Sequence, residues 1–111
     1  MGFKTSTSNL SLRQLRAFLS VAEEASMTRA ASRLHLTPSA LSMLVRSMED
    51  ELGFRLFDRT TRRLVLTDAG RQLLPTVRQV FAGLEHGIDA IHAAQQVKAS
   101  RLVVASSPLL A

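Results

Sequence analysis

Apolar residues recur with the period of an α-helix between Thr37 and Gly53. They occupy positions i, i+3, i+4, i+7 and i+11 and therefore share one face of the helix. Thr37 is the predicted N-cap, and Pro38 follows at the first helical position, where its missing N–H costs no hydrogen bond. Gly53 is the residue type that ends helices in the left-handed conformation. The apolar stripe consists of Leu41, Leu44, Val45, Met48 and Leu52.

A shorter helical pattern precedes this helix. Thr28 is the predicted N-cap, and Ala30, Ala31 and Leu34 mark one apolar face. His35 and Leu36 fill a turn of about three residues before the next helix. The stretch 27–46 is therefore predicted to be a helix-turn-helix.

Another amphipathic helix is expected from Leu12 to Ala25, with Ser11 as its N-cap. Its polar face is expected to hold Arg13, Arg16, Glu23 and Glu24. Its buried side is predicted to consist of Leu15, Phe18, Leu19, Ala22 and Ala25.

The character of the sequence changes after Gly53. Short extended runs at 56–57 and 64–66 flank the polar stretch DRTTRR, which predicts a β-hairpin wing over about 54–66. Its like charges repel one another unless a polyanion neutralises them, and Asp58 is the acid among them. A surface loop with solvated charge is the alternative. The wing arginines are Arg59, Arg62 and Arg63.

A long helix is predicted to follow, with Thr67 as its cap and Asp68 in its first turn. Its pattern continues over 68–98 and ends near Val97, and Pro75 inside it is expected to bend it. A three-helix core cannot cover so long an apolar stripe, so a second copy of the helix is the expected partner. The predicted dimerisation residues are Leu73, Leu74, Val77, Val80, Phe81, Leu84, Ile88 and Ile91.

The two ends of the chain carry weaker signals. Residues 1–9 are expected to be a loose arm and contain no secretory signal. Leu102–Val104 has the pattern of a buried strand, which cannot form a sheet alone. Residues 99–111 are therefore expected to begin another domain, and the chain to be a fragment.

Composition narrows the possible partners. The 111 residues carry fourteen Lys plus Arg against nine Asp plus Glu, a formal charge of +5, and twelve of the fourteen are arginines. Arginine matches phosphate geometry, which favours a nucleic-acid partner, although a basic but otherwise ordinary domain stays an alternative. The absence of cysteine fits a reducing cytoplasm, and no apolar run is long enough to span a membrane.

The outward face of the helix after Thr37 is the predicted DNA contact. Ser39, Ser42, Met43 and Arg46 follow one another at i, i+3, i+4 and i+7. A helix with such short hydroxyls fits the major groove closely, where Met43 is expected to pack on a thymine methyl. Met43 as an ordinary surface methionine is the alternative. Arg46 is expected on a phosphate rather than on guanine.

Helix starts and the wing supply the other DNA candidates. Thr28, Arg29 and Thr37 lie at helix starts, where free N–H groups and hydroxyls suit phosphates. The wing arginines are expected in an adjacent minor groove. Arg33 either faces solvent or pairs with an acid.

The sequence does not favour catalysis or a metal. His86 and His92 are six residues apart and do not share a helix face, and His35 lies in a turn. Residues 49–51, three consecutive acids, are interpreted as a solvated helix end. A protein-interaction scaffold that dimerises without DNA is the rival interpretation, and other basic winged-helix repressors are the nearest alternative that binds DNA.

Three stretches of sequence resemble the N-terminal DNA-binding domain of LysR-type transcriptional regulators. They are LRQLRAFLSVAEEASMTRAASRLHLTPSALS, MEDELGFRLFDR and LTDAG, and the resemblance covers about 10–94. It implies a mainly α fold: a winged helix-turn-helix over 10–67, with three helices and a short hairpin, followed by a dimerisation helix over 68–98.

The resemblance also implies function. It implies a homodimer, often assembled to tetramers in full-length members, on double-stranded promoter DNA, with a small-molecule effector only for a domain beyond this chain and no resident cofactor. It places Thr37, Pro38, Ser39 and Ser42 at the start of the recognition helix. Met43 and Leu44 stand where the family commonly has arginine and glutamine, which predicts fewer hydrogen bonds to bases.

Overall fold

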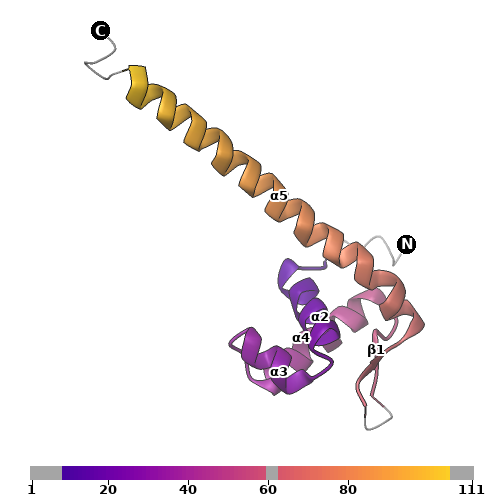
Figure 1. Cartoon of the computed structure of the whole chain (residues 1–111). Coiled ribbons are helices and arrows are strands. Elements are labelled where there is room, and N and C mark those ends of the chain that lie inside the picture. The colour runs from indigo at the N-terminus through magenta and orange to yellow at the C-terminus, as the bar shows by residue number, and fades with distance from the viewer. Residues whose placement is uncertain (1–8, 60–62, 106–111) are drawn as a thin grey trace. The chain divides into compact units, whose positions relative to one another are not determined.

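The computed structural model describes residues 9–59 and 63–105, with side chains through 101. It contains α2 (Leu12–Glu24), α3 (Met27–Arg33), α4 (Pro38–Leu52), β1 (Phe57–Asp58), β2 (Val65–Leu66) and α5 (Asp68–Ala105) (Figure 1). The predicted architecture, three helices and a hairpin followed by a long helix, is confirmed. The chain forms two compact units that divide after Arg78, so the first turns of α5 belong with the helices and the hairpin.

Local capping signals explain where the helices begin and end. Ser11 and Gln14 form a capping box at the start of α2, and the Thr37 hydroxyl accepts a hydrogen bond from the Ala40 N–H at 3.1 Å. Gly53 ends α4 with φ +82°, as predicted. The Thr67 hydroxyl accepts from the Gly70 N–H at 3.1 Å and so caps α5.

The core of the first unit lies where α2, α3 and α4 pack on one another. Leu41, Val45 and Met48 of the predicted α4 stripe are buried, and Leu44 and Leu52 are half-buried. Strand β1 joins this core, because the rings of Phe18 and Phe57 lie 5.6 Å apart at an interplanar angle of 54°. The helix-turn-helix and the hairpin therefore share one hydrophobic core.

The buried face of α2 differs from the prediction. Phe18 is buried as expected, but Leu15, Leu19 and Ala22 are half-buried, and Ala25 is exposed at φ +52° after the helix end. The buried face includes the small side chains of Ala17 and Ser20, which the sequence analysis did not assign to it. The residues that are buried on α2 are Gln14, Ala17, Phe18, Ser20 and Val21.

Gln14 is buried because its amide has partners at both ends. Its Oε1 accepts from the Ser11 N–H at 2.8 Å, and its Nε2 donates to Ser47 Oγ at 3.0 Å. A buried amide that is hydrogen-bonded in this way avoids the cost of desolvation. One side chain therefore caps α2 and links it to α4.

The hairpin pairs two short antiparallel strands, with Phe57 opposite Leu66 and Asp58 opposite Val65. The predicted wing is confirmed as a hairpin, with strands of two residues each. Residues 60–62 lie outside the described residues, so the prediction for Arg62 is not addressed by the structure.

The strand predicted at Leu102–Val104 is wrong, and so is the expected helix end near Val97. Helix α5 continues through both positions to Ala105. A strand needs a neighbouring strand for its backbone hydrogen bonds, and the strands among the described residues are the two that pair with each other in the hairpin. A helix satisfies the same groups within its own segment. Pro75 lies inside α5, and the expected bend there stays a prediction.

Two of the glycines in α5, Gly70 and Gly83, are predicted to respond oppositely to alanine. A methyl on Gly70 would overlap the Leu56 carbonyl oxygen and lie 2.8 Å from Cδ2 of Leu66, whereas one on Gly83 would meet nothing within 4 Å. Gly70→Ala should lower the free energy of unfolding by about 1–3 kcal/mol. Gly83→Ala should raise it by roughly 0.5–1 kcal/mol. Urea denaturation of both variants checks this, and equal effects would contradict the packing at Gly70.

Candidate nucleic-acid interface

Helix α4 presents the polar face that the sequence predicts. Ser39, Met43 and Arg46 are exposed, and Ser42 is half-buried. Met43 is 71% exposed, although burying such a side chain is worth about 1.5–3 kcal/mol. An apolar side chain left in water among polar ones is available for contact with a partner.

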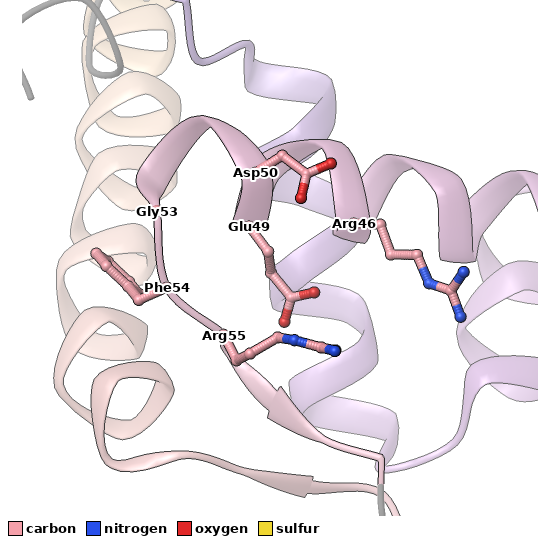
Figure 2. Close-up of a pocket in the computed structure, with 6 residues that line it drawn as sticks. All are labelled: Arg46, Glu49, Asp50, Gly53, Phe54 and Arg55. Carbon is pink, nitrogen blue, oxygen red and sulfur yellow. The ribbon is translucent and has the colours of Figure 1, made fainter. Parts of the chain in front are cut away.

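Glu49, three residues after Arg46 on α4, is the buried acid of this unit (Figure 2). It is 5% exposed, and its Oε2 accepts from the Leu56 N–H at 2.7 Å and from the Phe57 N–H at 3.2 Å. Its Oε1 accepts from Arg59 Nη1 at 2.9 Å. The interpretation of 49–51 as a solvated helix end is therefore wrong for Glu49, because the chain after Gly53 folds back over this carboxylate.

Arg59 lies at the base of the hairpin with its side chain 19% exposed. The expectation that Asp58 is the acid for the wing arginines is wrong here, because Glu49 pairs with Arg59. The Nε and Nη2 atoms of Arg59 are buried without a hydrogen-bond partner. Arg59 thus stabilises the first strand, and its contact with DNA stays a prediction.

Two hollows adjoin this ion pair, and both are lined by Arg46 and Arg55. Figure 2 shows Arg46 on α4 and Arg55 on the segment that follows Gly53. The first hollow measures about 640 Å³ and the second about 420 Å³. Sequence reasoning did not select Arg55, because it lies at the start of the predicted wing and outside its polar stretch DRTTRR. The sequence feature that could have indicated a DNA contact was the position of Arg55 in the basic stretch FRLFDR.

Arg63 is exposed. It lines a hollow with Leu64 and Val65, and with residues 25–27, where α2 gives way to α3. The second strand of the wing therefore lies beside the start of the helix-turn-helix.

Ser26, not Thr28, is the N-cap of α3. The Ser26 backbone is extended, and its hydroxyl accepts from the Arg29 N–H at 3.1 Å. The chain reverses over Ala25 and Ser26 alone, so Thr28 lies within the first turn of the helix and is exposed. Its predicted role at a phosphate does not depend on the cap.

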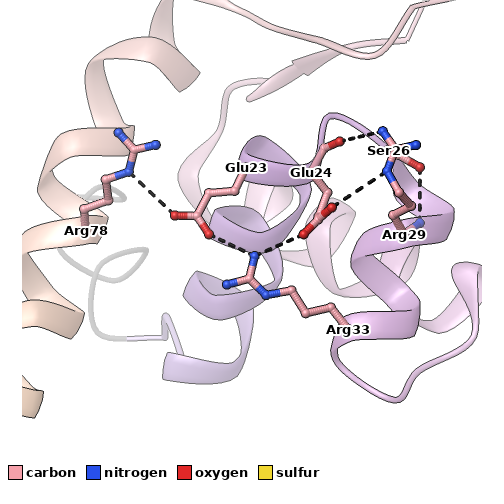
Figure 3. A network of polar contacts seen from close by, with 6 residues as sticks. All are labelled: Glu23, Glu24, Ser26, Arg29, Arg33 and Arg78. Atoms are coloured by element: carbon pink, nitrogen blue, oxygen red, sulfur yellow. Dashed lines mark hydrogen bonds and ion pairs between the residues drawn. The ribbon is translucent and has the colours of Figure 1, made fainter.

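Acids at the end of α2 hold the arginines of α3 and one from α5 (Figure 3). Arg33 Nη1 lies 3.1 Å from Glu23 Oε1 and 3.3 Å from Glu24 Oε2. Of the two alternatives for Arg33, pairing with an acid is therefore the one observed. Arg29 Nε lies 3.7 Å from Glu24 Oε1, and Arg78 Nε lies 3.8 Å from Glu23 Oε2. Such exposed pairs contribute about 0–1 kcal/mol each, so Arg29, 69% exposed, can exchange its partner for a phosphate.

The predicted dimerisation residues fall into two groups. In the first unit Val77 is buried and Leu73 and Leu74 are half-buried. In the second unit Phe81 is buried. The apolar side chains left exposed there are Val80, Leu84, Ile88, Ile91 and Val97.

The described residues contain no group of three His, Cys, Asp or Glu that could hold a metal. Within them, no helix has the length and hydrophobicity needed to cross a membrane.

Known proteins share both the sequence and the fold of this chain. The family model described as "Bacterial regulatory helix-turn-helix protein, lysR family" matches residues 12–71. The RuBisCO operon transcriptional regulator of Allochromatium vinosum is 41% identical over 97 residues, which cover 87% of this chain and 32% of that protein. The HTH-type transcriptional regulator PgrR of Escherichia coli is 51% identical over 76 residues, 68% of this chain and 24% of PgrR.

Solved structures include complexes with DNA. The BenM DBD bound to benA site 1 DNA matches with a TM-score of 0.73 and 28% identity, over 77% of this chain and 99% of that one. Vibrio fischeri DarR in complex with DNA matches with a TM-score of 0.72 and 30% identity, over 80% of this chain and 30% of DarR. The chain spans about a third of the length of the first curated relatives it matches.

Loss of the Glu49 carboxylate is predicted to destabilise the first unit. Glu49→Ala leaves the charge of Arg59 and two backbone N–H groups without their acceptor, which should cost about 3–5 kcal/mol of unfolding free energy. Asp50→Ala, a neighbouring exposed acid, should change it by less than about 0.5 kcal/mol. Urea denaturation compares the two, and equal losses would contradict the role of Glu49.

Proposed function

The chain belongs to the lysR family of bacterial regulatory helix-turn-helix proteins, and we propose that it binds double-stranded promoter DNA as a sequence-specific transcriptional regulator. The observation that carries the proposal is the exposed face of α4, with Ser39, Met43 and Arg46 directed away from the core. The matched relatives are named transcriptional regulators, and BenM and DarR are solved with DNA at TM-scores of 0.73 and 0.72. The proposed role is not enzymatic.

In the proposed complex α4 lies in the major groove. Ser39 and Ser42 donate or accept hydrogen bonds at base edges, because short hydroxyls let the helix approach closely. Met43 has no N–H or O–H to donate, so it packs on the methyl group of a thymine. Pro38 fixes the backbone where the helix starts.

Phosphates on either side of that groove position the helix. Thr28, Arg29 and Thr37 are exposed at the starts of α3 and α4 and are assigned to phosphate oxygens. The wing is assigned to the adjacent minor groove, where Arg63 and the undescribed Arg62 meet a concentrated negative potential.

We further propose that two copies associate through α5. The exposed stripe of Val80, Leu84, Ile88 and Ile91 has spacings of four, four and three residues, which suits packing against a second helix. A dimer would place two recognition helices on half-sites one or more helical turns apart. Tetramers, and an effector domain beyond residue 111, stay predictions from the family resemblance.

The base contact is tested by selection from a random double-stranded DNA library. The wild-type protein should enrich one motif, and Met43→Ala should lose its preference for thymine at one position by about 0.8 kcal/mol, roughly fourfold, the value of one buried methyl-sized group. Met43→Leu keeps an apolar side chain and should retain the preference. A protein that enriches no motif at low salt would overturn the proposed function, and an unchanged motif in Met43→Ala would overturn the thymine contact.

The dimer is tested with Ile88→Asp and the control Ala90→Asp, which lies on the opposite side of α5. Both residues are exposed in the single chain, so neither aspartate should unfold it. A charge at position 88 would be buried in the dimer, at a high desolvation cost. Light scattering should therefore report the 12.2 kDa monomer for Ile88→Asp and twice that mass for the control. A wild-type protein that binds DNA as a monomer would contradict the stripe as an interface.

A further inference from the structure

Arg46 and Arg55 border the same hollow although they belong to different elements. Arg46 is on α4, and Arg55 is on the segment between Gly53 and β1 (Figure 2). The second hollow, of about 420 Å³, is lined by three arginines, one aspartate and two uncharged residues. They are Arg46, Arg55, Arg59, Asp58, Phe57 and Thr67. Its ionisable lining therefore carries a formal charge of +2 (three minus one), and +1 (two minus one) without Arg59, whose charge Glu49 compensates.

No acid among residues 9–59 and 63–101 forms an ion pair with Arg46 or Arg55. By contrast, Arg29, Arg33, Arg59, Arg71 and Arg78 are each paired. Glu49 lines the first hollow but already accepts from Arg59 and two backbone N–H groups. Asp50 lines the first hollow and not the second. The second hollow is therefore the more favourable place for an anion.

The position of this hollow identifies the anion, given the proposed function. The major and minor grooves of a duplex are separated by one sugar–phosphate backbone. If α4 occupies the major groove and the wing the adjacent minor groove, that backbone must pass between α4 and the hairpin. Arg46 and Arg55 line the hollow there, and guanidinium groups bind phosphate oxygens in a bidentate manner.

We propose that Arg46 and Arg55 form a phosphate-binding site for the DNA backbone strand that separates the two grooves. This inference rests on the proposed function and adds Arg55 as a DNA-contact residue. The site positions the protein along the duplex and carries no base specificity, because every nucleotide presents the same phosphate.

The first test is Arg55→Gln, with Arg13→Gln as the matched control. Arg13 is also exposed and without an ion pair among the described residues, but it lines a separate hollow with Leu34, Leu36 and Leu44. Arg55→Gln should weaken binding about five- to tenfold for all sequences alike and reduce the slope of log Kobs against log salt by about 1. The selected motif and the Tm should not change.

The second test replaces single phosphates of a bound duplex by neutral methylphosphonates. The wild-type protein should lose affinity at one phosphate between the two groove contacts, and Arg55→Gln should lose nothing further there while keeping its losses elsewhere. Position-specific losses identical to those of the wild type would overturn the site. An equal loss of slope in Arg13→Gln would also overturn it, since the effect would then reflect general charge. A wild-type protein that binds no duplex would instead overturn the proposed function.

Discussion

The carboxylate of Glu49 joins the recognition helix to the wing, and the geometry of both elements depends on it. Two backbone N–H groups at 56 and 57 and the guanidinium of Arg59 point at its two oxygens, at 2.7–3.2 Å. A buried charge is tolerated only when its hydrogen bonds are complete, and here the partners come from the segment that must be ordered. The start of β1 is thereby held against α4, so the helix and the hairpin form one rigid surface rather than two independent ones.

The arginines of this unit differ in whether an acid of the protein pairs with them. Glu23 and Glu24 at the end of α2 hold the arginines of α3 and Arg78 in exposed pairs, while Glu49 holds Arg59 in a mostly buried one. The acids of this unit therefore neutralise arginines on two sides of the core. Arg46 and Arg55, which line a hollow between α4 and the hairpin, form no ion pair among the described residues and stay available to an anion placed there.

Helix α5 has two roles along its length. Its first turns belong to the unit that holds the helix-turn-helix, where Gly70 allows close approach to Leu56 and Val77 is buried. Further along, apolar side chains are exposed at regular spacing. The first part is explained by packing within one chain, and the exposed apolar side chains of the second are the basis of the proposed dimer.

Features that depend on a few neighbouring residues were predictable from the amino-acid sequence. Ser11, Thr37, Gly53 and Thr67 marked helix ends correctly, because a cap is a local hydrogen bond or a local backbone conformation. The spacing of the apolar positions correctly predicted α4, the hairpin and the start of α5. The polar face of α4 was predicted from the same spacing. Thr28 failed as a cap because Ser26, two residues earlier, offered the same hydroxyl after a shorter turn.

Contacts between residues far apart in the sequence depend on how the helices and the hairpin pack, which the sequence pattern does not contain. Glu49 appeared solvated beside two other acids, and its burial depends on a segment seven to ten residues away that folds back over it. The rotated face of α2 depends on how closely α3 and α4 approach, which the hydrophobic pattern of one helix does not contain. Leu102–Val104 has the composition of a strand, yet it continues α5, because the described chain provides no strand beside it. Arg55 gained its place in the candidate interface in the same way, by lying next to Arg46 in space.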